Sequence, residues 1–294
     1  MNKSIVILSI SLGLVFSATA QKKLTYEPLP YGKQNMSERH VINWPFLREA
    51  DVMYMWRTER IIDSREKQNI CMTWPKNPLW YILETAIMKD RSLNVYFTDS
   101  LLRKMQPEDI NSKINYETVI PVQDDPNDPY AVHDSTVQVV YHWDEIKRYK
   151  IMEDWIFDKK LSQFYCRIIG IAPMFQPYAG GMAVPEIPMC WIKYHDNGDG
   201  SLDDVGVPYT DTSTFRQLVI NQEIYNRFND ATRMSYDDFF EMRMFNSYIV
   251  KESNPFDMRI KQLDEFKDDP VSALLESDRI KQMLFEKEHD LWEF

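Results

Sequence analysis

Residues 233–254 read Arg233-Met-Ser-Tyr-Asp-Asp-Phe-Phe-Glu-Met-Arg-Met-Phe-Asn-Ser-Tyr-Ile-Val-Lys-Glu-Ser-Asn254, and this stretch predicts the helix around which the chain is organised. Ser235 is followed three residues later by Asp238, which resembles a capping box with Asp in place of Glu. Large apolar side chains then recur at spacings of three and four: Tyr236, Phe239, Phe240, Met244 and Tyr248. The Ser253-Asn254-Pro255 step predicts the end of the helix. We expect a buried core helix, in which Asp237 and Asp238 serve the first turn rather than catalysis.

Three runs rich in β-branched and aromatic residues predict the sheet that this helix covers. They are residues 151–157, 163–175 and 187–194. Short polar or Gly- and Pro-bearing segments separate them, which is typical of an antiparallel meander. We therefore expect an α+β fold, in which an antiparallel β-meander packs against helices and one face is covered by the 233–251 helix.

The remaining segments predict further helices and one more strand. The Asn77-Pro78 step opens a helix, and Pro270 opens a C-terminal helix. Residues 44–57 fit a helix or a helix that passes into a strand, residues 93–97 a strand, and residues 99–105 a short helix closed by Pro107. The two Asp-Pro steps within residues 124–129 predict a loop. The stripe expected on the C-terminal helix consists of Leu274, Leu275, Ile280, Leu284, Phe285, Leu291 and Trp292.

The N-terminus has the pattern of a secretory signal peptide. Lys3 precedes an apolar run over residues 5–16 and the small residues 17–20, which predicts cleavage between Ala20 and Gln21. We expect a signal peptide over residues 1–20, an extended arm over 21–44, an α+β domain over 45–257 and a helical tail over 258–294. The arm lacks apolar periodicity but carries candidate interface residues, which are Tyr26, Leu29, Tyr31, Met36 and Val41.

Charge and cysteine content limit the classes of partner and cross-link. The formal net charge is −11 at pH 7, and such a surface repels a phosphate backbone, which argues against nucleic acid as a partner. The three cysteines, Cys71, Cys166 and Cys190, form an odd set. Free, buried cysteines are favoured over a disulfide framework, and a single Cys166–Cys190 bridge stays open as the alternative. After residue 20 no segment is a candidate membrane span.

The sequence contains no recognisable catalytic or metal-binding constellation. The loop from His195 to Gly200 resembles a calcium loop, but His195 and Gly206 fall where the two end ligands are needed, so we expect a turn that binds no calcium. The five histidines lack metal-ligand spacing, and neither a G-x-S-x-G elbow nor a phosphate-binding loop occurs. We therefore predict no catalytic residue, no cofactor and no metal.

Four stretches, taken in order, resemble one family. They are Arg60-Ile-Ile-Asp-Ser-Arg-Glu-Lys67; Glu153-Asp-Trp-Ile-Phe-Asp158 with Arg167-Ile-Ile-Gly-Ile-Ala-Pro173; Met234-Ser-Tyr-Asp-Asp-Phe239 with Ser247-Tyr-Ile-Val-Lys-Glu-Ser-Asn254; and Arg279-Ile-Lys-Gln-Met-Leu-Phe285 with His289-Asp-Leu-Trp292. The run Trp191-Ile-Lys-Tyr194 matches an aromatic strand of the same family. From about Trp44 onward, the chain resembles the GldN (PorN) family of periplasmic gliding-motility and type IX secretion proteins.

This resemblance implies a structural, non-enzymatic part of a secretion machine. It implies periplasmic rings formed by copies of the chain with a lipoprotein of the GldK or PorK type, which attaches them to the outer membrane. It also implies contact with the inner-membrane motor protein of the GldM or PorM type, and neither a cofactor nor a catalytic residue. The alternative from another class is a soluble periplasmic ligand-binding or hydrolytic protein, which needs a pocket with convergent polar groups.

Overall fold

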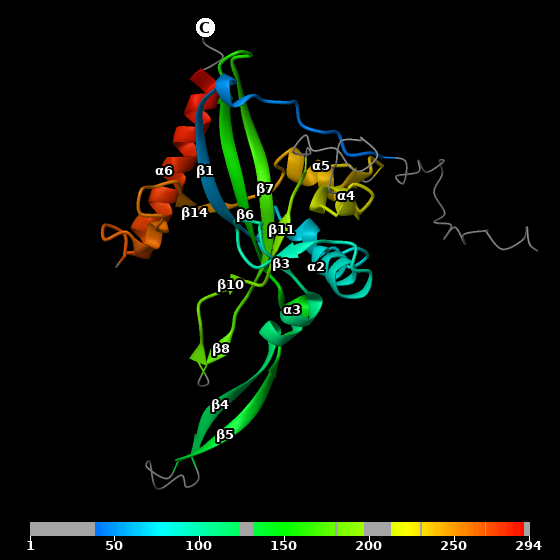
Figure 1. Ribbon diagram of the computed structural model, residues 1–294, viewed down its shortest axis with the longest axis vertical. Coiled ribbons are helices and arrows are strands. Elements are labelled where there is room, and N and C mark those ends of the chain that lie inside the picture. The colour runs from blue at the N-terminus through cyan, green and yellow to red at the C-terminus, as the bar shows by residue number, and fades with distance from the viewer. Residues whose placement is uncertain are drawn as a thin grey trace, which may run out of the picture. The chain divides into compact units, whose positions relative to one another are not determined.

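The computed structural model describes residues 39–123, 132–179, 182–196, 213–229, 231–267 and 269–290 (Figure 1). The predicted signal peptide, most of the predicted arm and the loop over residues 124–129 lie outside these residues. So do the calcium-like loop from residue 197 onward and the last four residues of the chain.

A large antiparallel sheet organises the fold. Its strand order is β14-β1-β6-β7-β11-β2-β3, and β10 also pairs with β7. The bounds are β1 Val52–Asp63, β2 Val95–Tyr96, β3 Lys104–Met105, β6 Arg148–Asp158, β7 Gln163–Phe175, β10 Ile187–Pro188, β11 Trp191–Lys193 and β14 Tyr248–Glu252. The meander over β6, β7 and β11 confirms the predicted α+β class.

Strand β6 lies at the centre of the sheet, and every residue after Arg148 is buried. It pairs with β1 on one side and β7 on the other along almost its whole length. Paired residues of neighbouring strands share a face. Thr58 opposite Glu153 therefore lies on one face, whereas Arg57 opposite Asp154 lies on the other. Glu153 and Asp154 are therefore neighbours in the chain but contact different side chains, on opposite faces of the sheet.

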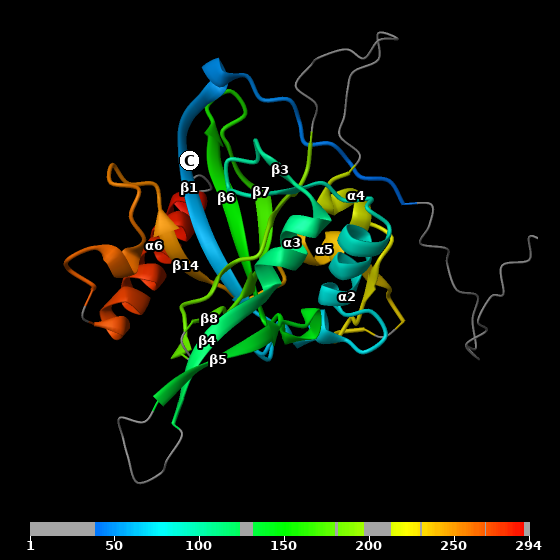
Figure 2. The same cartoon turned by 60° about the horizontal axis from the view of Figure 1, so that its bottom comes forward.

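We call the face that carries Thr58 and Glu153 the first face. Helices cover its lower part (Figure 2). They are α2 Leu79–Glu84, which continues as the π-helical turn η4 Thr85–Lys89, α4 Phe215–Val219 and α5 Tyr236–Glu241. An aromatic cluster joins α4 and α5 to the end of the meander. The ring centroids of Phe215 and Phe240 lie 5.3 Å apart, and those of Tyr194 and Phe215 lie 5.6 Å apart. Burial of these rings supplies much of the apolar stabilisation of this part.

Helix α6, Pro270–His289, packs against β14, the edge strand of the sheet, and its Ile280 and Leu284 share an apolar cluster with Trp155 of β6. Asp269 caps its start by accepting a hydrogen bond from the Val271 amide, and Pro270 lies in its first turn, which confirms the predicted start. The Ser277 hydroxyl accepts a 2.7 Å hydrogen bond from the Ile249 amide of β14. An exposed edge strand invites pairing with another chain, so α6 protects this edge.

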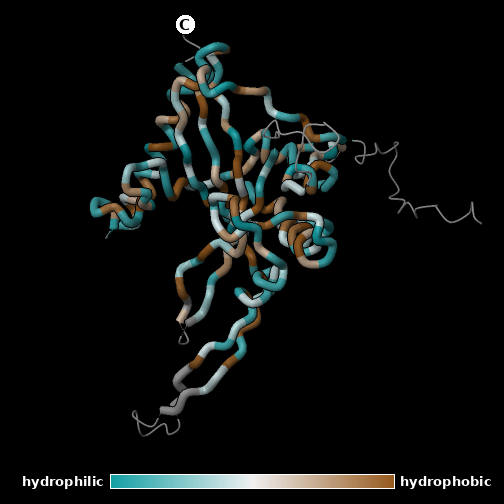
Figure 3. The backbone as a smooth tube through the Cα atoms, viewed as in Figure 1, coloured by the Kyte–Doolittle hydropathy of each residue, from teal (hydrophilic) through white to brown (hydrophobic). Residues whose placement is uncertain are grey.

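Two hairpins and several short elements complete the described part. Strands β4 Asn115–Gln123 and β5 Val132–Val140 pair with each other, as do β8 Tyr178–Ala179 and β9 Met182–Ala183. The Tyr116 hydroxyl donates a 2.9 Å hydrogen bond to the Tyr178 carbonyl and so links the hairpins. Val137 and Val140 of the first hairpin are exposed, and apolar segments are visible there in Figure 3. The remaining short elements are α3 Pro107–Ile114, β12 Glu223–Ile224, β13 Met234–Ser235, and the 3-10 turns η2 Glu49–Asp51, η3 Ile70–Thr73, η5 Trp143–Glu145 and η6 Ile260–Gln262.

The predicted helix over residues 233–251 is wrong in length. The capping box is present, since Ser235 and Asp238 exchange hydrogen bonds, but α5 ends at Glu241. Arg243 has φ 52°, a left-handed conformation that terminates the helix. The next apolar residues form β14 because β1 offers them an unpaired edge. Tyr248 therefore lies on a strand, and its helical spacing from Met244 is a coincidence.

Other predicted elements are partly confirmed. The helix after Asn77-Pro78 is present, with Leu79, Leu83 and Ile87 buried as expected. The expected strand over 93–97 shortens to β2. Residues 99–105 do not form a helix, and Pro107 begins α3 rather than ending an element. Residues 44–57 mostly lie outside helices, because the apolar alternation from Val52 pairs with β6 as strand β1.

On α6 the predicted apolar stripe is partly confirmed, since Ile280 and Leu284 are buried as expected, while Leu291 and Trp292 lie outside the described residues. The buried residues are Ala273, Ser277, Ile280 and Leu284. Leu274, Leu275 and Phe285 are instead exposed. Two small residues allow the helix to approach β14 closely, and hydrophobicity alone does not reveal that requirement.

Candidate functional site

A buried carboxylate lies at the centre of the first face. Glu153 of β6 has a fully buried side chain. Its oxygens accept hydrogen bonds from Thr58 at 3.0 Å and from the Trp155 indole at 2.9 Å. Arg60 of β1 donates to it through Nε, and Arg243 donates through Nη1 at 2.8 Å. We call these five residues together with Cys166 the Glu153 cluster.

Two guanidinium groups thus share one carboxylate. The Arg60 side chain is 4% exposed and that of Arg243 is 28% exposed. Both guanidinium carbons lie over the Trp155 ring, at 5.7 Å and 5.1 Å from its centroid. The strained left-handed backbone of Arg243 directs its side chain here from the turn after α5. The cluster therefore carries one more positive charge than negative charge.

The arginines keep Glu153 ionised in spite of its burial. Desolvation would raise the pKa of Glu153, but the charges of Arg243 and Arg60 and the hydrogen bonds outweigh it and lower the pKa to about 2. Burial raises the pKa of the Cys166 thiol well above its usual range, and the nearby Glu153 charge adds to this effect. Cys166 is therefore a protonated thiol that contacts an ion pair, and an activated nucleophile would need the opposite shift.

A cavity of about 560 Å³ lies between this cluster and α6. Arg60, Trp155 and Arg243 form the wall on the sheet side. The residues that α6 contributes are Asp278, Lys281, Gln282, Phe285 and Glu288. Phe245 and Ser247 complete the lining. Its volume is within the range of ligand pockets, and its lining is mostly polar and charged, with three aromatic rings.

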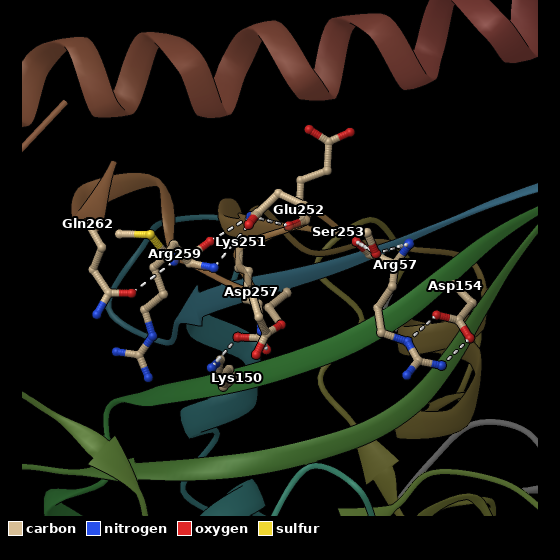
Figure 4. A network of polar contacts seen from close by, with 12 residues as sticks. Arg57, Lys150, Asp154, Lys251, Glu252, Ser253, Asp257, Arg259 and Gln262 are labelled. Atoms are coloured by element: carbon tan, nitrogen blue, oxygen red, sulfur yellow. Dashed lines mark hydrogen bonds and ion pairs between the residues drawn. The ribbon is translucent and has the colours of Figure 1, made fainter. Parts of the chain in front are cut away.

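The opposite face of the same strands carries a different charge arrangement (Figure 4). Arg57 and Asp154 form a two-bond ion pair with distances of 2.7 and 2.8 Å. Lys150 pairs with Glu59, Lys251 lies 3.6 Å from Glu59, and Lys251 also pairs with Asp257 at 2.5 Å. We call this set of six the Glu59 row. It contains three cationic and three anionic side chains, so its charges balance.

A third ionic contact holds the start of the described chain against α5. Arg39 pairs with Asp238 at 2.6 Å, and the Arg216 guanidinium donates a 3.1 Å hydrogen bond to the Ile42 carbonyl. Arg216 also binds Asp237 through Nε at 2.8 Å, and both side chains are almost fully buried. Asp237, which we expected only to serve the helix dipole, is therefore half of a buried ion pair.

The structure describes few of the predicted site residues. Tyr26, Leu29, Tyr31 and Met36 lie outside the described residues, as do Ala20 and Gln21 at the expected cleavage site. Val41 is half-buried, next to Ile42, whose carbonyl accepts a hydrogen bond from Arg216 of α4. Their assignment as interface or processing residues stays a prediction.

The three cysteines are free, as the favoured interpretation expected. Burial raises the pKa of Cys190 to about 12, so this thiol is a packing residue. Within the residues that the structure describes, no group of His, Cys, Asp or Glu side chains could hold a metal ion. No helix in the same part is both long enough and apolar enough to cross a membrane.

Sequence reasoning did not find the Glu153 cluster. The available signal was the position of Glu153 inside the apolar run of residues 151–157, where an unpaired charge would be costly. Its partners Arg60 and Arg243 come from distant segments, so their convergence appears only in three dimensions. Each of the four stretches quoted for the resemblance supplies or flanks residues of this cluster or of the adjacent cavity.

The comparison with protein families decides the assignment. The family described as gliding motility associated protein GldN matches residues 47–293. The chain belongs to the GldN family. Members of the GldN family are components of the gliding-motility and type IX secretion apparatus, which makes this protein a component of that apparatus and not a member of a known enzyme family. A comparison with curated proteins finds no match.

Proposed function

We propose that this protein is a non-enzymatic structural component of a periplasmic ring in the type IX secretion and gliding apparatus. In this proposal copies of the chain form the ring with an outer-membrane lipoprotein of the GldK or PorK type. The ring also contacts a motor protein of the GldM or PorM type. The GldN family match over residues 47–293 carries the proposal, because it covers nearly all of the expected mature chain.

The structural features are compatible with such a role. The edge of the main sheet at β14 is covered by α6, which guards against uncontrolled pairing with other chains. In contrast, Val119, Val137 and Val140 of the β4–β5 hairpin are 50%, 41% and 54% exposed, so the hairpin offers apolar side chains for a protein contact. The raised thiol pKa values of Cys166 and Cys190 do not favour nucleophilic chemistry.

Assembly is tested by measuring mass in solution. The purified protein is analysed by size exclusion with light scattering, alone and with a soluble form of the lipoprotein partner. A ring component is expected to shift to a complex of many subunits. If the mass stays that of a single chain or a one-to-one pair, the alternative of a soluble periplasmic ligand-binding or hydrolytic protein is favoured.

We also propose that the segment before Arg39 acts in assembly, through Tyr26, Leu29, Tyr31 and Met36. Deletion of residues 22–38 is expected to leave the melting temperature unchanged and to weaken ring formation. Deletion of residues 22–43 serves as the comparison. It also removes the Arg39–Asp238 pair and the Ile42 carbonyl that Arg216 binds, so it should destabilise the fold by about 1–2 kcal/mol. Normal ring formation by the shorter deletion would reduce the segment to a tether.

The processing of the chain completes the proposal. Residues 1–20 act as an export signal, and the mature chain begins at Gln21 in the periplasm. Mass spectrometry of the N-terminal peptide from the envelope fraction tests this step. Recovery of a peptide that still carries Met1 from the assembled complex would contradict it.

A further inference from the structure

The charges of the Glu153 cluster leave hydrogen-bond donors without a partner. Arg60 uses only Nε, which binds Glu153. In the part of the chain that the structure describes, its two Nη groups make no hydrogen bond, although the side chain is 96% removed from solvent. An arginine presents five N–H donors, so a buried one normally has several partners. An arginine with unused donors at a cavity wall is a feature of anion sites.

Arg243 adds a second set of donors at the same wall. Its Nη1 binds Glu153 at 2.8 Å and the Cys166 sulfur at 2.9 Å. Within the described residues, its Nε and Nη2 have no hydrogen-bond partner. Among the described residues, Glu153 is the only carboxylate that forms an ion pair with either arginine. Burial lowers the pKa of Arg243, whereas the charge of Glu153 and, more weakly, that of Glu288 across the cavity raise it, although Glu288 does not pair with Arg243. The unused N–H donors of both arginines are therefore the feature of this wall that a ligand can engage.

The wall formed by α6 differs in character. Asp278, Gln282 and Glu288 of α6 offer oxygen acceptors, and Lys281 adds one cation. The rings of Phe285 on α6 and of Phe245 before β14 add apolar surface. Phe285 is 60% exposed, so it lies where a ligand could cover it. The cavity thus combines N–H donors on the sheet side with acceptors and aromatic rings around them. A peptide segment matches this arrangement, because it supplies a carboxylate, backbone N–H groups and apolar side chains together.

We propose that this cavity binds a carboxylate of a polypeptide, held by Arg60 and Arg243 above the Trp155 ring. The carboxylate is either a Glu or Asp side chain or a chain terminus. Planar two-bond recognition by guanidinium groups suits a carboxylate better than a single-point anion. In the assembled complex the peptide belongs to a partner protein, and this part of the inference rests on the proposed function. Binding of the peptide group itself does not.

The test uses the intact mature protein and two matched pairs of probes. The first pair is N-acetyl-phenylalanine and its amide, which differ only in the terminal carboxylate. The second pair is acetyl-Phe-Glu-Phe-amide and acetyl-Phe-Gln-Phe-amide, which differ only in the side-chain carboxylate. Binding is followed by the NMR signal of the Trp155 indole N–H, which donates to Glu153 at 2.9 Å and lies beside both guanidinium groups. A Trp155→Phe variant assigns the signal.

We expect a saturable shift with an acidic probe and no shift with its neutral counterpart. Tighter binding of N-acetyl-phenylalanine identifies a chain terminus as the source of the carboxylate, and tighter binding of acetyl-Phe-Glu-Phe-amide identifies a side chain. Affinity should fall by about tenfold when salt is raised from low to high ionic strength, because a charge pair drives binding. Equal binding of the neutral probes, or no shift with either acidic probe, would overturn the proposal.

Two variants and a control locate the site. Arg243→Gln should weaken binding of the acidic probe by at least about tenfold. Since this change could perturb the buried cluster, Phe285→Glu provides the decisive variant, because its side chain is exposed at the cavity and the new charge repels the ligand. Phe256→Glu is the matched control, since Phe256 is 75% exposed and does not line the cavity. Equal effects of the two Phe→Glu variants would place the site elsewhere.

The outcomes of this test and of the assembly test are independent. Peptide binding without ring formation would leave the carboxylate site in place and remove the proposed function. Ring formation without binding of any acidic probe would leave the proposed function in place and remove the carboxylate site.

Discussion

The Glu153 cluster and the Glu59 row are both centred on β1 and β6, but they lie on opposite faces and differ in their charge pairing. Glu59 and Arg60 are neighbours on β1, yet they lie on different faces because side chains alternate along a strand. In the Glu59 row each cation has an acid, so the set is neutral. In the Glu153 cluster two arginines share one acid beside a cavity. Of two adjacent residues, Glu59 therefore belongs to a network in which every charge is paired, and Arg60 belongs to the wall of the proposed binding cavity.

Removal of the shared acid should have the largest effect. Glu153→Gln keeps the shape of the side chain but leaves Arg60, which is buried, and Arg243, which is partly buried, without a paired anion. We expect a loss of about 3–5 kcal/mol in the free energy of unfolding, since uncompensated buried charges are costly. Urea unfolding followed by circular dichroism measures this loss. A loss below about 1 kcal/mol would mean that solvent already screens the two arginines.

Acid should remove the same contribution in the unmodified protein. The pKa of Glu153 is lowered from 4.5 to about 2 in the folded state. Its stabilising contribution is therefore complete above about pH 4.5 and is lost as the pH falls through about 2, which amounts to about 3 kcal/mol. The stability difference between wild type and Glu153→Gln, measured by urea unfolding across this window, should shrink by that amount.

Acid titration of other groups affects both of these proteins equally. The pKa of Asp63, for example, is also lowered, first by its hydrogen bond to Arg65, with a further contribution from Arg148. A difference between wild type and Glu153→Gln that stays constant with pH would show that Glu153 does not titrate as the structure indicates.

Single cations should matter less than the shared acid. Arg243→Met leaves Arg60 to neutralise Glu153, so we expect a loss of about 1–2 kcal/mol, mainly for the hydrogen bonds. Lys251→Met leaves Glu59 with Lys150 and should cost about 1 kcal/mol. Thermal unfolding of both variants provides the comparison. If Arg243→Met cost as much as Glu153→Gln, the cluster would not hold an excess of positive charge.

The smallest loss of stability is expected for the Arg57–Asp154 pair of the Glu59 row. Arg57 is 46% exposed, so water can solvate it when its acid is removed. Asp154→Asn should therefore cost at most about 1 kcal/mol, although the pair has two short hydrogen bonds. The same unfolding measurements test it beside Glu153→Gln, from which it differs by one position in the chain. A loss comparable with that of Glu153→Gln would remove the distinction between the two faces.

Local patterns in the sequence determined the elements whose partners are close in the chain. The meander, the helix after Asn77-Pro78, the capping box at Ser235 and Asp238, and the start of α6 at Pro270 are all local signals, and each is present. Together with the ordered family stretches, they led to the α+β class and to the GldN family. Hydrophobic period and capping chemistry act within one or two turns, so they can be recognised without the fold.

Tertiary structure decided the rest. Residues 248–252 have helix-like spacing but form β14, because β1 presents an unpaired edge that satisfies their backbone groups. Ser277 faces the sheet, and Leu274 does not, because the Ile249 amide needs an acceptor there. The Glu153 cluster joins β1, β6, β7 and the turn after α5, which the sequence separates by up to 183 residues between Arg60 and Arg243. Desolvation and charge pairing act through space, so only the folded chain reveals which charges share a partner and which remain open.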